Sequence, residues 1–421
     1  MNNISTSKLK KFLIKNIVVI VFVVISILAF IASKQSLYFL MSQLLERISR
    51  NSFLVLSLLI PVMAGMGLNF SIIIGAMAGQ AALIIVTNYQ IAFWNGFGGI
   101  ILAMAIAAPM AIVFGVLTGM LLNKTKGQEM IASMIVGFFA NGIYQFIFLF
   151  AVGGLFTVRN KDLLLTSGVG LRNSITFTES LKFGLDFGGV TKVPFFNILM
   201  VISGIMILVY LIMFMLKKTL TGKQKSGIAM SAIVLVFSAL IMYTNIFPLQ
   251  IRMLKSLTFP AVSGLFIALL CGFNMIIIKT KLGQDFRAVG QNQHIAAVSG
   301  INVNRVRIIA ITISTVLAAW GQIIFLQEIG VMNTFGSHVQ IAQFSVAALL
   351  VGGATVSRAT NNNAIVGVIL FHTLFIVSPF AGKELFGDPQ IGEFFRTFVA
   401  YGVIGLSLGL YAWKTLFTSK K

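Results

Sequence analysis

The chain has 421 residues, of which 58% are hydrophobic and only 10% are charged, and its mean hydropathy is +0.98. This composition excludes an ordinary soluble domain. The formal charge of +21 would suit nucleic acid, but the basic residues lie between apolar runs instead of forming one patch. That distribution argues against a nucleic-acid partner and favours the lipid bilayer and its anionic headgroups.

Apolar runs of about 20 residues, the length that crosses the hydrocarbon core, recur along the chain. They predict an all-α, polytopic integral membrane bundle of about 10–12 transmembrane helices, with residues 1–421 forming a single transmembrane domain. In the third span, glycines and amides predict a broken or tilted helix. The predicted spans are 13–32, 52–70, 72–90, 97–122, 130–154, 195–217, 228–248, 259–279, 305–326, 341–357, 363–380 and 396–417.

Three segments fall outside these spans. Leucines recur at helical spacing in residues 33–51, with charged residues on other faces, which predicts an interfacial amphipathic helix. Residues 155–194 mix polar side chains with glycines and are expected to form an external loop over the mouth of the protein. Residues 280–304 form an unusually long connection between two apolar spans.

Charge asymmetry predicts the orientation. If residues 72–90 cross the membrane, 19 of the 31 Lys and Arg residues lie on the side of the N-terminus and 12 lie on the other side. The short loops on the cytoplasmic side of membrane proteins carry the excess of Lys and Arg. Both termini and the 280–304 segment are therefore expected to be cytoplasmic, in a multi-pass protein.

Glycine pairs at four-residue spacing predict close helix packing, since backbones approach each other through small residues in lipid. The pairs are Gly75/Gly79, Gly115/Gly119 and Gly405/Gly409.

Polar side chains within the predicted spans are costly in lipid, so they mark either interhelical hydrogen bonds or a solute path. The candidates for the substrate path are Asn69, Gln80, Asn141, Gln145, Asn274, Gln322 and His372. Only Glu328, at the outer end of a span, is acidic, which counts against proton- or sodium-coupled carriers and charge-selective channels. The three histidines are scattered, so no metal site is expected. No Walker loop occurs, so no nucleotide site is expected, and no catalytic site is expected either.

The connection between the spans 259–279 and 305–326 is more than a polar linker. Residues 284–297 predict a short helix opened by Asp285. A connector in water would not need Phe286 and Val289, so docking to a partner protein is favoured over a solvated linker.

The same connection carries motifs of a known family. Gly283, the run Arg287-Ala288-Val289-Gly290-Gln291-Asn292 and the run from Ser299-Gly300 to Arg305 resemble the cytoplasmic coupling segment of ABC importer permeases. Two weaker signatures agree with this resemblance, an early G-L-N…A-G-Q and a late L-G-G…G. They stand at Gly67-Leu68-Asn69 with Ala78-Gly79-Gln80, and at 347–353 with Gly367.

This resemblance implies a type II-like importer permease of the group that serves ribose and other sugars, nucleosides and branched-chain amino acids. It implies three kinds of partner: a cytoplasmic ABC ATPase dimer, a second permease chain that is the same or homologous, and an extracytoplasmic substrate-binding protein. It places ATP and Mg on the ATPase, no cofactor in this chain, and the chain in the bacterial cytoplasmic membrane. The expected contacts with the ATPase are Asp285, Phe286, Arg287, Ala288, Val289, Gly290, Asn292 and Gly300.

The sequence therefore favours a transport subunit, not an enzyme, for a small polar solute, with a sugar or nucleoside ahead of a branched-chain amino acid. An ATP-independent secondary carrier or channel is the alternative from another class. A membrane-embedded enzyme is disfavoured, because no acid–base or metal constellation converges.

Overall fold

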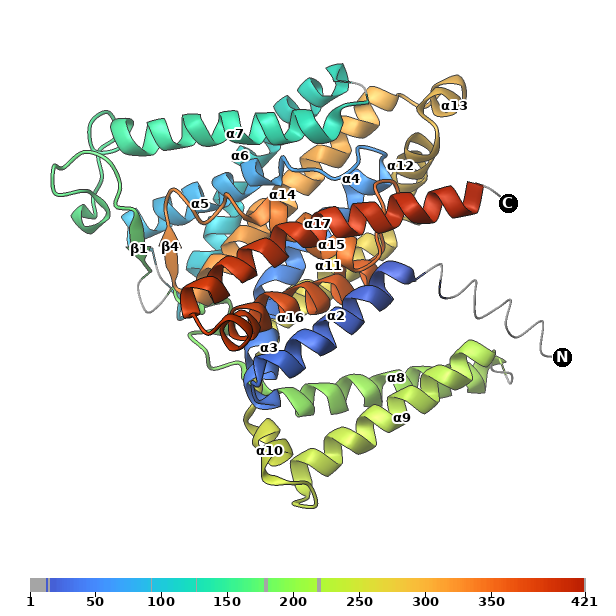
Figure 1. The fold of residues 1–421 in the computed structure, drawn as a ribbon. Helices are drawn as coiled ribbons and strands as arrows, with labels where there is room; N and C mark the ends of the chain where they lie inside the picture. Colours follow the sequence, from blue (N-terminus) through green and yellow to red (C-terminus); the bar gives the residue numbers. More distant parts are fainter. Residues whose placement is uncertain are drawn as a thin grey trace.

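The computed structural model describes residue 13 and residues 16–91, 93–125, 127–177, 181–217 and 221–419. The described part is a bundle of helices with two small two-stranded sheets at its edge (Figure 1). The helices that correspond to the predicted spans are α2 (Ile17–Ser33), α3 (Leu37–Ser57) with α4 (Leu59–Met63), α5 (Ile72–Asn88), α6 (Phe97–Lys124), α7 (Glu129–Phe146), α8 (Phe195–Lys217), α9 (Gly222–Tyr243), α11 (Ala261–Ile277), α14 (Val303–Ile329), α15 (Ile341–Val351), α16 (Asn361–Phe386) and α17 (Pro389–Ser419).

Seven of the described helices are long and apolar enough to cross a membrane, namely α6, α7 with its short π-helical extension η1 (Ile147–Ala151), α8, α9, α14, α16 and α17. An eighth candidate is α11 together with α12 (Lys281–Gln291), which are bent by 76° at their junction. Three shorter apolar helices are α2, α5 and α15. The predicted all-α polytopic bundle is confirmed. The number of about 10–12 transmembrane helices stays a prediction, because it depends on whether the shorter helices cross the bilayer.

Helix α14 lies at the centre of the bundle and is covered by α5 on one side and α6 on another (Figure 1). Glycines allow this proximity. A Cβ on Gly75 or Gly79 would lie 2.3 or 2.4 Å from a carbonyl oxygen of α14, and one on Gly115 would lie 2.7 Å from the Cα of Thr312. The packing predicted for these pairs is confirmed. A Cβ on Gly405 or Gly409 would have no neighbour within 4 Å among the described residues, so this pair shows no such packing within the chain.

The segment 33–51 does not form a separate interfacial helix in this chain. It is continuous with the first part of the predicted span 52–70 as α3, which packs against α14, α16 and α11. Leu40, Leu44 and Leu45 are buried, so its leucine stripe is satisfied by other helices of the bundle. The rest of the span 52–70 forms the short helix α4 and an irregular stretch.

Helix α5 is continuous from Ile72 to Asn88, so the break predicted from its glycines and amides does not lie within it. The break comes before it, where Gly65 and Gly67 have φ values of +71° and +68°. These left-handed conformations suit glycine and turn the chain between α4 and α5. Gly75 and Gly79 instead serve the contact with α14.

The C-terminal helices form a second layer with α2 and α3. The crossing of α15 and α16 is very close, since a Cβ on Gly352 would lie 1.8 Å from the oxygen of Asn363 and one on Gly367 would lie 1.9 Å from the oxygen of Ala348. The late glycine signature is therefore a backbone-to-backbone contact. The start of α2 and the end of α17 lie on the same side of the bundle as α12 and α13 (Gln293–Val298) (Figure 1).

The 155–194 loop packs over one end of the helices. Its short helical turns are η2 (Lys161–Leu163) and η3 (Gly184–Asp186), and its strand β1 (Ser174–Thr176) pairs antiparallel with β4 (Val331–Asn333). Asp186 is fully buried and accepts hydrogen bonds from Ser263 and from the backbone of Val262 at the start of α11. The loop is thus tied to α11 and to the end of α14.

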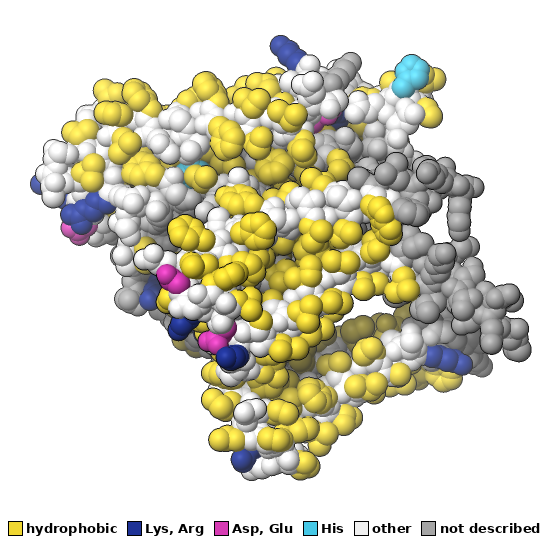
Figure 2. Space-filling model, viewed as in Figure 1, with side chains coloured by type: hydrophobic (Ala, Val, Ile, Leu, Met, Phe, Trp, Pro, Cys, Tyr) yellow, Lys and Arg dark blue, Asp and Glu magenta, His cyan; other side chains and the backbone are white. Residues whose placement is uncertain are grey.

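Helices α8 and α9 form a hairpin that stands away from the bundle (Figure 1). Their side chains are mostly exposed and apolar, and Figure 2 shows a hollow between the hairpin and the body. At its base, β2 (Lys192–Pro194) pairs antiparallel with β3 (Thr258–Pro260), and the short turns α10 (Leu249–Arg252) and η4 (Met253–Ser256) lie nearby. A small cluster around Leu45 and Leu254 joins this base to α3.

The hairpin is expected to be dispensable for folding. Pro194 and Thr258 are paired across the β2–β3 ladder, which places their Cα atoms about 5 Å apart. A Gly-Gly linker can therefore replace residues 195–257. Because α8 and α9 pack mainly against each other, the variant should insert, purify as one monodisperse species and keep its melting temperature within a few degrees. Aggregation of the variant beside a well-behaved wild type would show that the hairpin belongs to the core.

Candidate functional site: coupling helix and polar cluster

The chain turns sharply between α11 and α12. A Cβ on Gly283 would lie 2.0 Å from the carbonyl oxygen of Ile277, so only glycine fits at this bend. The hydroxyl of Thr280 accepts a hydrogen bond from the Gly283 amide and caps the helix. The helix thus begins four residues before Asp285, where the sequence predicted its start. Asn292 caps α13 in the same way, accepting from the amides of His294 and Ile295.

One face of α12 belongs to the core of this chain. Phe286 is 0% and Val289 is 1% exposed, and α12 packs against α4. Gly290 lies directly on α4, because a Cβ there would lie 2.1 Å from the oxygen of Met63. The expectation that Phe286, Val289 and Gly290 contact a partner is therefore wrong, since the chain itself occupies those positions. A bulky side chain at Gly290 would disrupt this packing before any docking.

The opposite face of α12 and α13 is free of other described parts of the chain. Arg287 is exposed and donates a hydrogen bond to the oxygen of Ile278, while Ala288 and Asp285 are partly exposed at the flank. Gly300 has a φ of +84° and forms an open turn before α14. We call the coupling face the exposed residues of these two helices, which are Lys281, Gln284, Arg287, Gln291, His294, Ile295, Ala297 and Val298.

Two large apolar side chains on the coupling face are exposed to solvent. Ile295 is 63% and Val298 is 78% exposed. Exposed apolar residues on a polar loop indicate a protein contact more often than a solvated connector. The exposed apolar residues of this segment are thus on α13, not on α12.

A buried ion pair connects α13 and α14 to α7. The guanidinium of Arg307, at the start of α14, is fully buried and lies 2.6 Å from the carboxylate of Glu129, the first residue of α7. The same guanidinium lies 3.5 Å from the side-chain oxygen of Gln293 in α13. Removing one partner of such a pair leaves an uncompensated buried charge, which costs about 3–5 kcal/mol. The bond therefore holds α7, α13 and α14 together.

A polar cluster joins α5 to α7 within the bundle. The imidazole of His338, in the turn before α15, lies 2.5 Å from the amide oxygen of Gln80 and 2.7 Å from that of Asn141. Gln145 donates to Asn141 at 3.5 Å, and the ring of Tyr144 lies 4.8 Å from the imidazole. Gln80 and His338 are fully buried, whereas Asn141 and Gln145 are partly exposed. We call these four polar residues, Gln80, Asn141, Gln145 and His338, the polar cluster.

Three of the predicted path residues therefore meet at one place, and the residue that connects them was missed. His338 was counted only among three scattered histidines. Its neighbours in the sequence gave a signal, because the turn between α14 and α15 also contains Asn333, Thr334 and Ser337. Gln80 donates to the backbone oxygen of Asn333 at 3.4 Å. That polar turn folds back into the bundle.

The structure distributes the other predicted path residues elsewhere. Asn69 accepts hydrogen bonds from the backbone and the hydroxyl of Ser71, which shapes the start of α5. Gln322 is fully buried beside Gly79, and neither of its amide atoms has a partner among the described residues. Gln322 is therefore the remaining candidate close to the polar cluster.

Asn274 and His372 lie in helix contacts. Asn274 donates to the side-chain oxygen of Asn361 and to the backbone of Leu56, and so fastens α11 to α16 and α3. His372 is buried beside the rings of Phe371 and Phe375. These two residues are not brought to the polar cluster.

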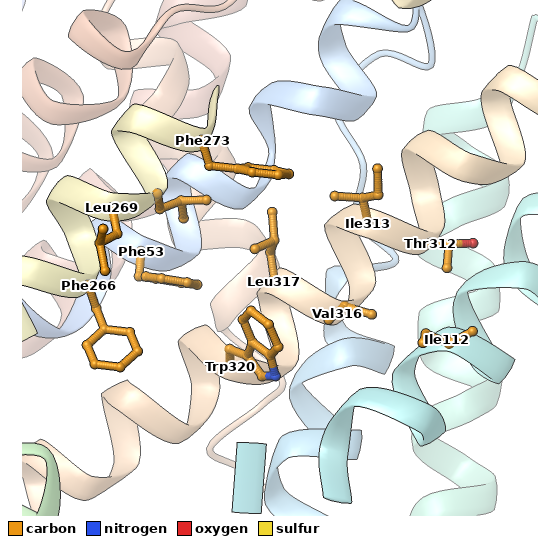
Figure 3. A pocket seen from close by; sticks show the side chains of 11 residues that line it. Phe53, Ile112, Phe266, Leu269, Phe273, Thr312, Ile313, Val316, Leu317 and Trp320 are labelled. Carbon is orange, nitrogen blue, oxygen red and sulfur yellow. The ribbon is translucent and has the colours of Figure 1, made fainter. Parts of the chain in front are cut away.

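A separate cavity of about 600 Å³ lies between α3, α6, α11 and α14. Figure 3 shows aromatic and aliphatic side chains from these helices around it, including Phe266, Phe273 and Trp320. Its one hydroxyl, that of Thr312, is already bonded to the oxygen of Ile308. Its lining is therefore apolar, which does not suit a polar solute. In the described part of the chain, no group of three His, Cys, Asp or Glu side chains could hold a metal ion.

Comparisons with known proteins identify the family. The family model described as "Branched-chain amino acid transport system / permease component" matches residues 40–404. The autoinducer 2 import system permease protein LsrC of Klebsiella pneumoniae is 38% identical over 114 residues, and that of Enterobacter sp. strain 638 is 36% identical over 116 residues. Each of these matches covers 25% of this chain and 33% of the relative.

LsrC of Yersinia enterocolitica is 32% identical over 124 residues, which are 28% of this chain and 33% of the relative. The chain thus matches about a third of the length of these curated relatives. No solved structure matches significantly. Since the family model covers most of the helical bundle, including α12, α13 and the polar cluster, the chain belongs to the family of branched-chain amino acid transport system permease components.

Proposed function

We propose that the chain is the permease subunit of an ATP-driven importer and that the polar cluster contacts a small, neutral, polar solute on its path. The observation that supports this proposal most directly is the His338 bridge between Gln80 and Asn141. Polar groups inside a membrane bundle face its interior or a water-filled cavity. Asn141 and Gln145 occupy the partly exposed side of α7, so this side of α7 would face the path and not lipid.

The chemistry of the polar cluster favours a hydroxyl-rich solute. It consists of amides and an imidazole, and no carboxylate or ammonium group hydrogen-bonds to it among the described residues. Amides and imidazoles both donate and accept hydrogen bonds, as hydroxyl groups of sugars and nucleosides do. The α-amino and carboxylate groups of a branched-chain amino acid would lack charged partners here. A sugar or nucleoside is therefore preferred, in line with relatives named for autoinducer 2 import.

The position of the coupling face supports the proposed partners. It lies on the side of the bundle that holds the start of α2 and the end of α17, which we assign to the cytoplasm of a bacterium (Figure 1). An ABC ATPase dimer, with ATP and Mg, would dock there, and an extracytoplasmic binding protein would dock at the opposite end, near the 155–194 loop. A second permease chain, the same or homologous, would complete the path. The sequence contains no Walker loop, so ATP hydrolysis would belong to the partner ATPase.

The proposal is tested by purifying the tagged chain from its native membrane and identifying the subunits that accompany it by mass spectrometry. An ATPase and a substrate-binding protein should co-purify. Uptake of labelled sugars, nucleosides and branched-chain amino acids by cells with and without the gene then compares the three solute classes. Transport that persists when ATP is depleted, with no ATPase present, would support the secondary-carrier alternative instead.

Replacing His338 tests the solute path. A His338→Phe variant keeps the ring but removes both hydrogen bonds to Gln80 and Asn141, which should raise the KM for uptake roughly tenfold. The matched control is His372→Phe, a buried histidine outside the polar cluster, which should leave the KM unchanged. Equal effects of the two replacements, at equal membrane abundance, would remove the polar cluster from the path.

Replacing Val298 tests the coupling face. Val298→Asp places a charge at a position that is 78% exposed, so the chain should fold and insert normally. Desolvating this charge in a docked complex costs several kcal/mol, and ATPase co-purification and uptake should be lost. Val190→Asp, which is 80% exposed in the opposite loop, is the matched control and should retain the ATPase. Normal ATPase retention by Val298→Asp would show that α13 is not the docking element.

A further inference from the structure

A second polar site lies away from the polar cluster, in a cavity of about 480 Å³ between α3, α16 and α17. Its polar lining includes the side chains of Arg47 from α3, Lys383 from α16, and Glu393 and Arg396 from α17. The cavity therefore holds three basic side chains and one acidic side chain. No role in solute transport accounts for it.

The charges within the cavity do not balance. The carboxylate of Glu393 forms an ion pair with the guanidinium of Arg396 at 2.5 Å. Arg47 and Lys383 form no ion pair within 4.0 Å among the described residues, and the buried Nε of Arg47 has no hydrogen-bond partner there. Arg47 is partly buried, and a buried cation is normally paired. The cavity therefore carries two positive charges, on Arg47 and Lys383, without an anionic partner among the described residues.

The remainder of the cavity is aromatic. The guanidinium groups of Arg47 and Arg396 lie 4.8 and 4.9 Å from the centre of the Phe375 ring. Phe39 and Phe380 complete the lining and pack edge to face, with ring centres 5.3 Å apart. A ligand of this cavity must combine an anionic group with apolar segments. A free inorganic ion would leave the aromatic half unused.

The cavity opens where the bundle surface changes from charged to apolar. Figure 2 shows a small group of Lys, Arg, Asp and Glu side chains around the turn between α16 and α17, with hydrophobic side chains along the helices beside it. Leu385 and Phe394, on either side of this turn, are 63% and 74% exposed. Charged residues followed by exposed apolar residues are typical of the membrane–water interface.

We propose that this cavity binds one anionic phospholipid, with its phosphate between Arg47 and Lys383 and its acyl chains along Phe39, Phe375 and Phe380. Arginine recognises phosphate through two parallel hydrogen bonds, and a lysine ammonium adds a compact positive charge. The lipid would connect α3, which packs on the central α14, with the peripheral α16 and α17. It would act as a structural ligand, independent of the transported solute.

The test uses the full chain, purified with any accompanying subunits, and titrated with phosphatidylglycerol or phosphatidylcholine in nanodiscs and by native mass spectrometry. Wild type should bind one phosphatidylglycerol in preference to phosphatidylcholine. Arg47→Gln and Lys383→Gln should each weaken this binding about tenfold. Lys383 is exposed, so its variant reports on binding even if Arg47→Gln folds poorly. Lys255→Gln, which removes an equal charge outside the cavity, should bind as wild type does.

Three results would overturn the proposal. They are equal binding of the two lipids by wild type, unchanged phosphatidylglycerol binding in Lys383→Gln and Arg47→Gln, and displacement of the lipid by millimolar inorganic phosphate, which would indicate a site for the free ion. Loss of transport in these variants is not used as a readout. The lipid site therefore stands or falls separately from the importer assignment.

Discussion

The close approach of α5 and α6 to the central helix α14 is the constraint on which the rest of the bundle depends. Lipid tails are as apolar as leucine, so hydrophobic burial gives helices little reason to associate in a bilayer, and packing at short range must replace it. Gly75, Gly79 and Gly115 bring the backbones together until a single methyl group would overlap with α14. The fully buried amides and the polar turn before α15 keep their positions because these backbones are fixed.

Helices α12 and α13 are connected to the polar cluster by two separate series of contacts. In the first, Gly290 of α12 lies on α4, whose end leads through Gly65 and Asn69 into α5 and hence to Gln80. In the second, Gln293 of α13 contacts Arg307, which is paired with Glu129 at the start of α7, the helix that carries Asn141 and Gln145. His338 contacts both Gln80 and Asn141 and so joins the ends of the two series of contacts. A displacement of α12 and α13 would therefore act on both sides of the polar cluster.

The polar residues of the spans show why burial alone does not identify a path. Asn274 and Gln80 are equally buried and equally expensive in lipid. The amide nitrogen of Asn274 donates to Asn361 and to a backbone oxygen, which makes Asn274 part of a helix contact. Gln80 is satisfied through a histidine that also reaches the partly exposed amides of α7. The two residues therefore differ in their hydrogen-bond partners: the partner of Gln80 also contacts the partly exposed amides of α7, and the partners of Asn274 belong to a helix contact.

The membrane class, the order and approximate limits of most helices, and the tight glycine packing of α5 and α6 could be predicted from the sequence, because these depend on local composition and on spacing along one helix. The motifs of residues 280–304 also singled out that segment. Its free face could not be predicted, since Phe286 is fully buried and Gly290 lies against α4, more than 200 residues earlier in the chain. The same holds for the joining of Gln80, Asn141 and His338, and for the burial of the 33–51 segment. Such contacts between distant residues depend on how helices are placed against one another, which no local pattern records.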